Sequence, residues 1–162
     1  MTDVLSTWSP PGASERLAIL ERTRSIAIVG VSANVSRPSN FVATYMMSSS
    51  ADYEMYFVNP TFDELFGQPV YPTLADLPVV PDMVDVFRRP DDLRAVAEEA
   101  IDLGSKVFWA QLGLMHQGAA DLAHQAGLDV VMDRCLKIEH ARFHGGLHLA
   151  GFDTGVIDSR RR

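Results

Sequence analysis

The chain has 162 residues, of which 47% are hydrophobic, so it has room for one domain with a sizeable core and not for a second catalytic domain. Its net charge of −7 argues against nonspecific binding of nucleic acid, because a polyanion requires a basic face, although helix N-termini and a few arginines can still attract a small anion. The apolar stretches are only strand-length and the chain does not start with a basic region followed by an apolar one. We therefore expect neither a membrane span nor a signal peptide, and hence a cytoplasmic protein.

The chain begins with an irregular lead-in over residues 1–13, which is polar and proline-rich. A short helix should follow, with Ser14 as its N-cap and its end near Arg24. The run 25–31 is nearly continuous in hydrophobicity and rich in β-branched residues, which is typical of a central parallel strand buried on both faces. A second helix is expected from Pro38 into the serines at 48–50.

The rest of the chain continues the alternation of strands and helices. After a strand at 55–58, the stretch to Pro81 is rich in proline and predicts a long turn-rich connection with at most short helical pieces. The remaining predicted elements are a strand at 83–87, a helix from Asp91 to Gly104, a strand at 106–110, a helix ending at Gly127 and a strand at 128–132. This order predicts an α/β, doubly wound fold with a mostly parallel five-stranded sheet and helices on both faces.

Each of the five apolar runs is followed by polar or conformationally special residues. Since ligands of open α/β sheets bind outside the carboxyl ends of the strands, this pattern predicts a ligand site at that edge. The five exits are Gly30-Val31-Ser32, Asn59-Pro60, Phe87-Arg88-Arg89, Gln111 and Asp133-Arg134-Cys135.

The first exit does not fit an ordinary dinucleotide loop. Of the three glycines that such a loop requires, only Gly30 is present, because Ser32 and Val35 occupy the other two positions. The second strand also ends at Asn59, where an acidic residue would hold the ribose of NAD. Arg37 adds a cation suited to a phosphate that NAD lacks, but Gly30 and Arg37 alone fit a tight turn and a solvated charge equally well.

Two later exits favour an anionic ligand. Arg88 directly follows its strand, so we favour it over Arg89 as the residue that reaches a bound anion. Gln111 is a polar residue at the end of a buried strand, which indicates either a ligand contact or a hydrogen bond that fixes the loop.

With these segments in order, the chain resembles the small CoA-binding proteins whose single domain is similar to the nucleotide-binding domain of the succinyl-CoA synthetase alpha subunit. The resemblance covers roughly residues 14–140 and leaves 141–162 as a tail of unclear structure. It rests on the segments IAIVGVSANVSRPSN, YFVNP, GQPVYPTLADLP, DMVDVFRRPDD, KVFWAQLG and GLDVVMDRCLKIEH.

The resemblance implies a Rossmann-like domain that holds coenzyme A along the strand exits. It places Gly30, Val31 and Ser32 at the phosphates, with Arg37, Ser39 and Asn40 close by. Asn59 and Pro60 would shape the adenosine side, and Phe87, Arg88 and Gln111 would face the crevice. The synthetases need a second domain with a phosphorylated histidine, for which this chain has no room, so the resemblance supplies a ligand and no reaction.

Two further groups of residues carry weaker hypotheses. His140, His144 and His148 recur every four residues, but Gly145-Gly146 interrupts any such helix and no cysteine or carboxylate pair completes a metal site. Cys135, the single cysteine, agrees with a reducing compartment and lies beside Arg134, so it is either a small buried hydrophobe or a thiol able to form a mixed disulfide with CoA.

The prediction is therefore a protein that binds CoA or an acyl-CoA as a small-molecule ligand, without catalysis of its own, and that could sense this ligand or deliver it to a partner. It has no catalytic constellation, no nucleic-acid or membrane partner is expected, and the sequence names no protein partner. Two alternatives stay open: an NAD(P)-binding redox regulator or enzyme, and an interaction module with a vestigial crevice whose tail contacts a partner.

Overall fold

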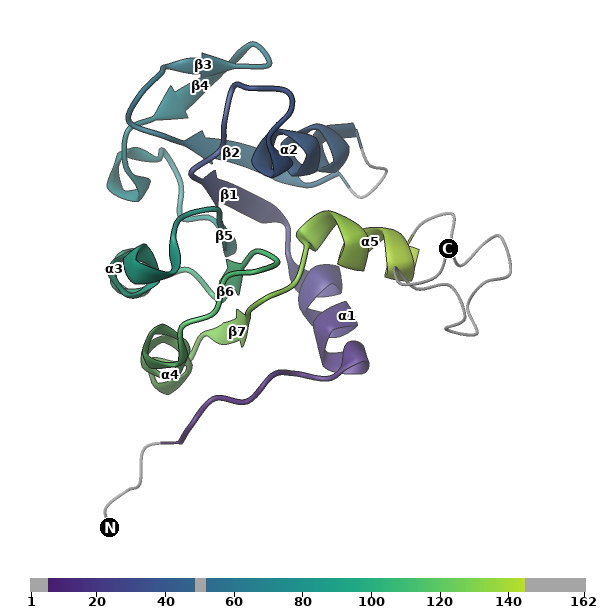
Figure 1. The fold of residues 1–162 in the computed structure, drawn as a ribbon, viewed down its shortest axis with the longest axis vertical. Helices are drawn as coiled ribbons and strands as arrows, with labels where there is room; N and C mark the ends of the chain where they lie inside the picture. Colours follow the sequence, from purple (N-terminus) through teal and green to yellow (C-terminus); the bar gives the residue numbers. More distant parts are fainter. Residues whose placement is uncertain (1–5, 49–51, 145–162) are drawn as a thin grey trace.

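The sheet of this protein has seven strands, as seen in a computed structural model that describes residues 6–48 and 52–144 (Figure 1). Its strand order is β3-β4-β2-β1-β5-β6-β7, and every neighbouring pair is parallel except β3 and β4. The strands are β1 (Ser25–Val29), β2 (Glu54–Val58), β3 (Glu64–Leu65), β4 (Gln68–Tyr71), β5 (Met83–Val86), β6 (Val107–Ala110) and β7 (Asp129–Val131). The predicted α/β class with a mostly parallel sheet is confirmed.

The prediction of five strands was wrong, because the proline-rich connection after β2 contains a β-hairpin. Phe66 and Gly67, between β3 and β4, have φ values of 54° and 77°. A two-residue turn with both φ values positive matches the twist of a hairpin, but a phenylalanine is an unusual residue there. β4 then pairs with β2 in parallel, with Tyr71 opposite Val58, and so widens the sheet.

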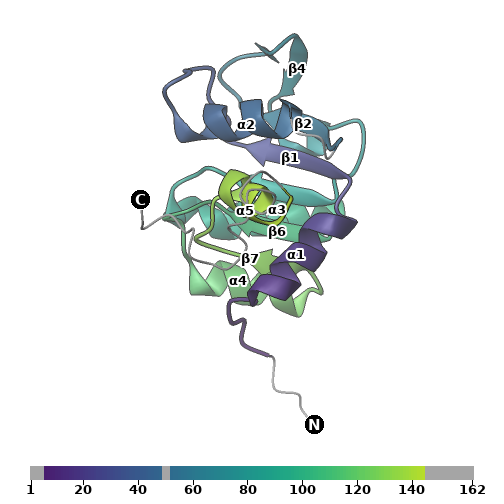
Figure 2. The same ribbon diagram turned by 90° about the vertical axis from the view of Figure 1, so that its right-hand side faces the viewer.

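Helices cover both faces of the sheet, which confirms the doubly wound arrangement. Figure 2 looks onto the face covered by α1 (Ala13–Arg22), α2 (Pro38–Ser48) and α5 (Leu136–His144). The opposite face carries α3 (Leu93–Leu103) and α4 (Gln117–Gln125), and two short 3-10 turns, η1 (Leu74–Asp76) and η2 (Pro90–Asp92), lie in the connections. None of the helices described is long and apolar enough to cross a bilayer.

The helix ends agree only in part with those predicted from the sequence. Gly104 ends α3 with a φ of 97°, as its position in the sequence predicts. Ser14 is not the N-cap of α1, because the helix begins at Ala13, two residues earlier than expected. Its N-cap is Gly12, whose N–H donates to Glu15 Oε1 at 3.0 Å. The predicted domain boundary after His140 falls within α5, and residues 145–162 lie outside the described part of the chain.

The N-terminal segment before α1 covers the edge of the sheet at β7 (Figure 1). Trp8 is buried there, and its indole N–H donates to the Val130 carbonyl at 2.9 Å. Its backbone N–H and carbonyl bond to Asp121 Oδ1 at 2.8 Å and Gln117 Nε2 at 3.0 Å, both on α4. The segment thus occupies a backbone carbonyl that an open edge strand would expose.

Candidate functional site

The chain reverses its direction of winding between β1 and β5. β1 is followed by α2 and β2 on one side, whereas β5 pairs with the other side of β1, with Val29 opposite Val86. The segments that leave these two strands therefore diverge at their carboxyl ends. In open α/β sheets, such a switch point is where ligands bind.

Gly30 brings the two exits into contact. It adopts a φ of +87°, and its N–H donates to the Val58 carbonyl at 2.9 Å. A Cβ at this position would lie 2.4 Å from the carbonyl oxygen of Phe87 and 3.0 Å from Cδ of Arg88. Only glycine fits this approach, so three of the predicted site residues lie together at the switch point.

Three other predicted site residues fix the shape of the loop that follows Gly30. Ser39 Oγ accepts the N–H of Ser32 at 2.9 Å, and the amide of Asn40 donates to the Ser32 carbonyl at 2.9 Å. The amide of Asn59 donates to the Val31 carbonyl at 2.8 Å. These side chains bond to backbone groups and thereby position the loop.

The loop presents hydrogen-bond donors in front of a helix N-terminus. Among the residues that the structure describes, the backbone N–H groups of Ala33 and Val35 have no acceptor. Arg37 is exposed and makes no ion pair within the same set, and α2 starts at the next residue. Free N–H groups, a helix dipole and a guanidinium together favour a bound oxyanion.

The two arginines after β5 differ in position. Arg88 packs its aliphatic stem against Gly30 and keeps 41% of its side chain exposed, with its guanidinium 3.6 Å from Asp92. Arg89 is 88% exposed and lies 4.0 Å from the same carboxylate. Arg88 therefore lies against the first strand exit, and the preference for it over Arg89 stays a prediction.

The remaining predicted site residues lie around this centre. Phe87 is half-buried and packs against the core under α2 and α5, and Pro60 is exposed beside Asn59. Gln111 is buried across β5 from Gly30, and its Oε1 accepts the N–H of Leu136 at 3.5 Å. Of the two roles considered for Gln111, this contact matches the loop-fixing one, because it ties the exit of β6 to the start of α5.

Sequence reasoning missed one unusual residue near this centre, Asp85 in β5. It lies in register with Ile28 and Trp109 and is fully buried, and neither carboxylate oxygen has a partner among the described residues. Burial raises the pKa of Asp85 well above its ordinary value. A charged residue inside the apolar run MVDVF was the signal in the sequence.

Asp85 predicts a specific dependence of stability on pH. The folded state keeps the proton that the unfolded chain loses above the ordinary aspartate pKa, so stability should fall as pH rises through the interval between the two pKa values. The slope from this one group is about 1.4 kcal/mol per pH unit. Urea denaturation at a series of pH values above the ordinary aspartate pKa should show this fall as a difference between the wild type and Asp85→Asn. Parallel stability curves would contradict the assignment of a neutral Asp85.

The histidine and cysteine hypotheses gain no support from geometry. His140 is buried and its Nδ1 lies 2.9 Å from the Tyr45 hydroxyl, His144 is the last described residue, and His148 lies outside. In the described ranges, no group of three His, Cys, Asp or Glu side chains could hold a metal ion. Cys135 is half-buried beyond β7, and its disulfide with CoA stays a hypothesis.

A separate cavity of about 380 Å³ lies away from the switch point. It is bounded by the N-terminal segment, α1 and β7, and its lining includes Trp8 and the ion-paired Arg22 and Asp129. None of the predicted site residues lines it.

Comparison with known proteins relates this chain to proteins that it matches over almost their whole length. The chain is 40% identical over 131 residues to "Uncharacterized protein YneT" of Bacillus subtilis (strain 168). The match covers 81% of this chain and 96% of that protein. A hypothetical protein from Pyrococcus horikoshii OT3 has a similar structure, with a TM-score of 0.79, 34% identity, and coverage of 86% of this chain and 99% of that chain.

A larger enzyme contains a similar domain. A dinucleotide-forming acetyl-coenzyme A synthetase 1 of Ca. Korarchaeum cryptofilum matches 70% of this chain over 27% of its own, with a TM-score of 0.62 and 25% identity. The sequence profile described as "CoA binding domain" matches residues 24–141, which include the switch point and every predicted site residue. The chain therefore belongs to the CoA-binding domain family.

Proposed function

We propose that this protein binds CoA or an acyl-CoA at the switch point between β1 and β5 and has no catalysis of its own. The observation that carries the proposal is the contact of Gly30 with Phe87 and Arg88, which joins a donor-rich loop to a second arginine. Membership of the CoA-binding domain family supports the choice of ligand. The match to only 27% of an acetyl-coenzyme A synthetase supports a binding role, because a similar domain is one part of that enzyme.

In this proposal the ligand lies across the strand exits. Its diphosphate oxygens accept hydrogen bonds from the free backbone N–H groups of the loop after Gly30. The adenosine lies on the side of Asn59 and Pro60. The ribose 3′-phosphate, which dephospho-CoA lacks, is within the reach of Arg37 or Arg88. The pantetheine arm runs past Phe87 towards the exit of β6.

The two cationic contacts can be measured one at a time. We expect Arg37→Gln and Arg88→Gln each to lose about 1.5–3 kcal/mol of CoA binding, which corresponds to an affinity about 10- to 150-fold weaker. Removing the 3′-phosphate should produce a similar loss in the wild type and a smaller one in the variant whose arginine contacts it. Isothermal titration of ligand-stripped protein with CoA and dephospho-CoA measures both effects.

Arg89→Gln is the matched control, because Arg89 neighbours Arg88 but is almost fully exposed. Its substitution should change CoA affinity by less than about threefold. Equal affinity for CoA and dephospho-CoA, or an equal effect of Arg88→Gln and Arg89→Gln, would contradict the proposed phosphate contacts.

A further inference from the structure

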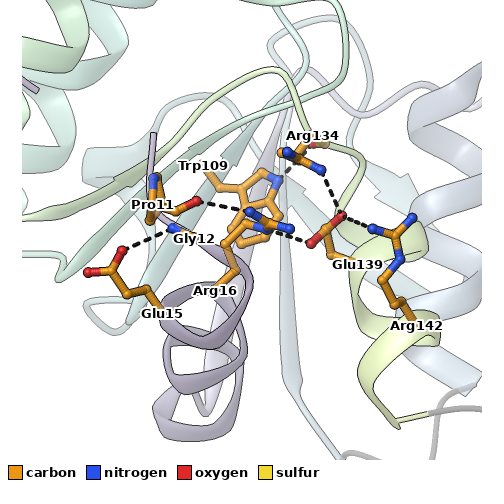
Figure 3. A network of polar contacts seen from close by, with 8 residues as sticks. All are labelled: Pro11, Gly12, Glu15, Arg16, Trp109, Arg134, Glu139 and Arg142. Atoms are coloured by element: carbon orange, nitrogen blue, oxygen red, sulfur yellow. Dashed lines mark hydrogen bonds and ion pairs between the residues drawn. The ribbon is translucent and has the colours of Figure 1, made fainter. Parts of the chain in front are cut away.

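Three arginines converge on one buried carboxylate between α1 and α5 (Figure 3). The side chain of Glu139 is 2% exposed, and its Oε1 accepts the Nε–H of Arg16 at 2.7 Å. Arg16 is also buried and donates through Nη1 to the Pro11 carbonyl at 2.9 Å. Arg134 and Arg142 each place an Nη1 atom 3.5 Å from the other oxygen, Oε2.

The charges in this cluster do not balance. Arg16 makes the short contact and by itself neutralises Glu139. Arg134 and Arg142 have no other acidic partner in the described part of the chain, and 3.5 Å is longer than a charge-assisted hydrogen bond of about 2.7–2.9 Å. Their side chains are 42% and 33% exposed, so water and solutes reach both guanidinium groups. Two positive charges therefore remain at the surface of a protein whose net charge is −7.

We propose that Arg134 and Arg142 form an anion site that takes a small oxyanion, a phosphate or a carboxylate. Glu139 holds both guanidinium groups near one point, so their planar forks are positioned before the anion arrives. The bound anion supplies the counter-charge that is missing beside the two arginines, and it reduces the electrostatic repulsion between their guanidinium groups.

The site is separate from the proposed CoA phosphate contacts. Arg134 follows β7, which is two strand spacings from β5, where Arg88 lies, and three from β1. At the usual spacing, the exit of β7 is therefore about 10 Å from the exit of β5 and about 14 Å from that of β1. The oxyanion can come from solution, or it can be a carboxylate at the end of an acyl group on bound CoA. The second source rests on the proposed function, and the first does not.

The two tryptophans of the chain provide a local readout. The indole N–H of Trp109 donates to the Arg134 carbonyl at 2.9 Å, whereas that of Trp8 donates to Val130 under the N-terminal segment. We expect inorganic phosphate, added at constant ionic strength to ¹⁵N-labelled protein, to shift the Trp109 indole resonance in a saturable way. The Trp8 resonance should stay in place and show that the fold is unchanged.

Substitutions test whether the two arginines cause the shift of the Trp109 resonance. The double variant Arg134→Gln, Arg142→Gln should keep both indole resonances and lose the saturable shift, and it retains the Arg16–Glu139 pair. Arg37→Gln should keep the shift, because its loop belongs to the other site. Arg94→Gln, which removes an exposed ion pair on α3, should also keep it. No saturable shift in the wild type, or an undiminished shift in the double variant, would overturn the proposal.

Matched thioesters distinguish the two sources of the oxyanion. Glutaryl-CoA and pentanoyl-CoA have acyl chains of equal length and differ in a terminal carboxylate. If the ligand carries the anion, glutaryl-CoA should bind at least about tenfold more tightly, and the double variant should lose this preference with its CoA affinity unchanged. Equal affinity for glutaryl-CoA and pentanoyl-CoA would show that the site takes an oxyanion from solution. A protein that binds no CoA at all would contradict the proposed function and leave the phosphate result as an independent test of this site.

Discussion

Glu139→Gln should lower the free energy of unfolding by about 3–5 kcal/mol, because it leaves the guanidinium of Arg16 buried without a counter-charge. Both side chains are almost entirely buried, and their contact joins α1 to α5 over a sequence separation of 123 residues. The loss should be seen as a lower midpoint in urea denaturation with an unchanged slope.

An exposed pair provides the control for this experiment. Arg94 and Glu98 lie 3.6 Å apart on α3, with more than half of each side chain exposed. Glu98→Gln should therefore change the free energy of unfolding by less than about 1 kcal/mol. If Glu139→Gln costs no more than Glu98→Gln, the cluster does not stabilise the fold in the way that we describe.

Gly30→Ala should disrupt both stability and ligand binding. The positive φ alone costs an alanine about 1–2 kcal/mol, and the new methyl group would lie 2.4 Å from the Phe87 carbonyl oxygen. The exits of β1 and β5 must then separate, so we expect a total loss of stability above about 2 kcal/mol and a CoA affinity at least about tenfold weaker. Urea denaturation and isothermal titration measure the two effects.

Gly67 is the matched control for Gly30. It has a similar φ of +77°, but a Cβ there would meet no atom within 4 Å. Gly67→Ala should therefore show only the conformational cost, with CoA affinity unchanged. Equal effects of the two substitutions on binding would show that the close approach at Gly30 is not part of the site.

Helices and strands were predicted correctly where the pattern of hydrophobic residues matched the one expected for that element. The central strands β1, β5 and β6 are buried on both faces and mostly apolar, so their runs were recognised. The hairpin β3–β4 was missed because its turn uses Phe66 in a conformation that seldom suits a side chain. Helix α5 was missed because it buries two polar residues, Glu139 and His140, and so lacks an apolar stripe.

The candidate site was predicted in part, for a related physical reason. The rule that ligands bind at strand exits placed Gly30 and Arg88 at one edge, and the structure brings them into contact. The sequence could not distinguish a ligand contact from a scaffold contact for Ser39, Asn40 and Asn59, because the same hydroxyl and amide groups serve either purpose. Their partners are backbone atoms of the loop, which only the folded chain reveals.

A crystal structure of the protein with CoA would test the central claim most directly. The account predicts the diphosphate against the backbone of residues 30–37, and the ribose phosphate within hydrogen-bond reach of Arg37 or Arg88. CoA bound instead in the cavity between the N-terminal segment, α1 and β7 would contradict it.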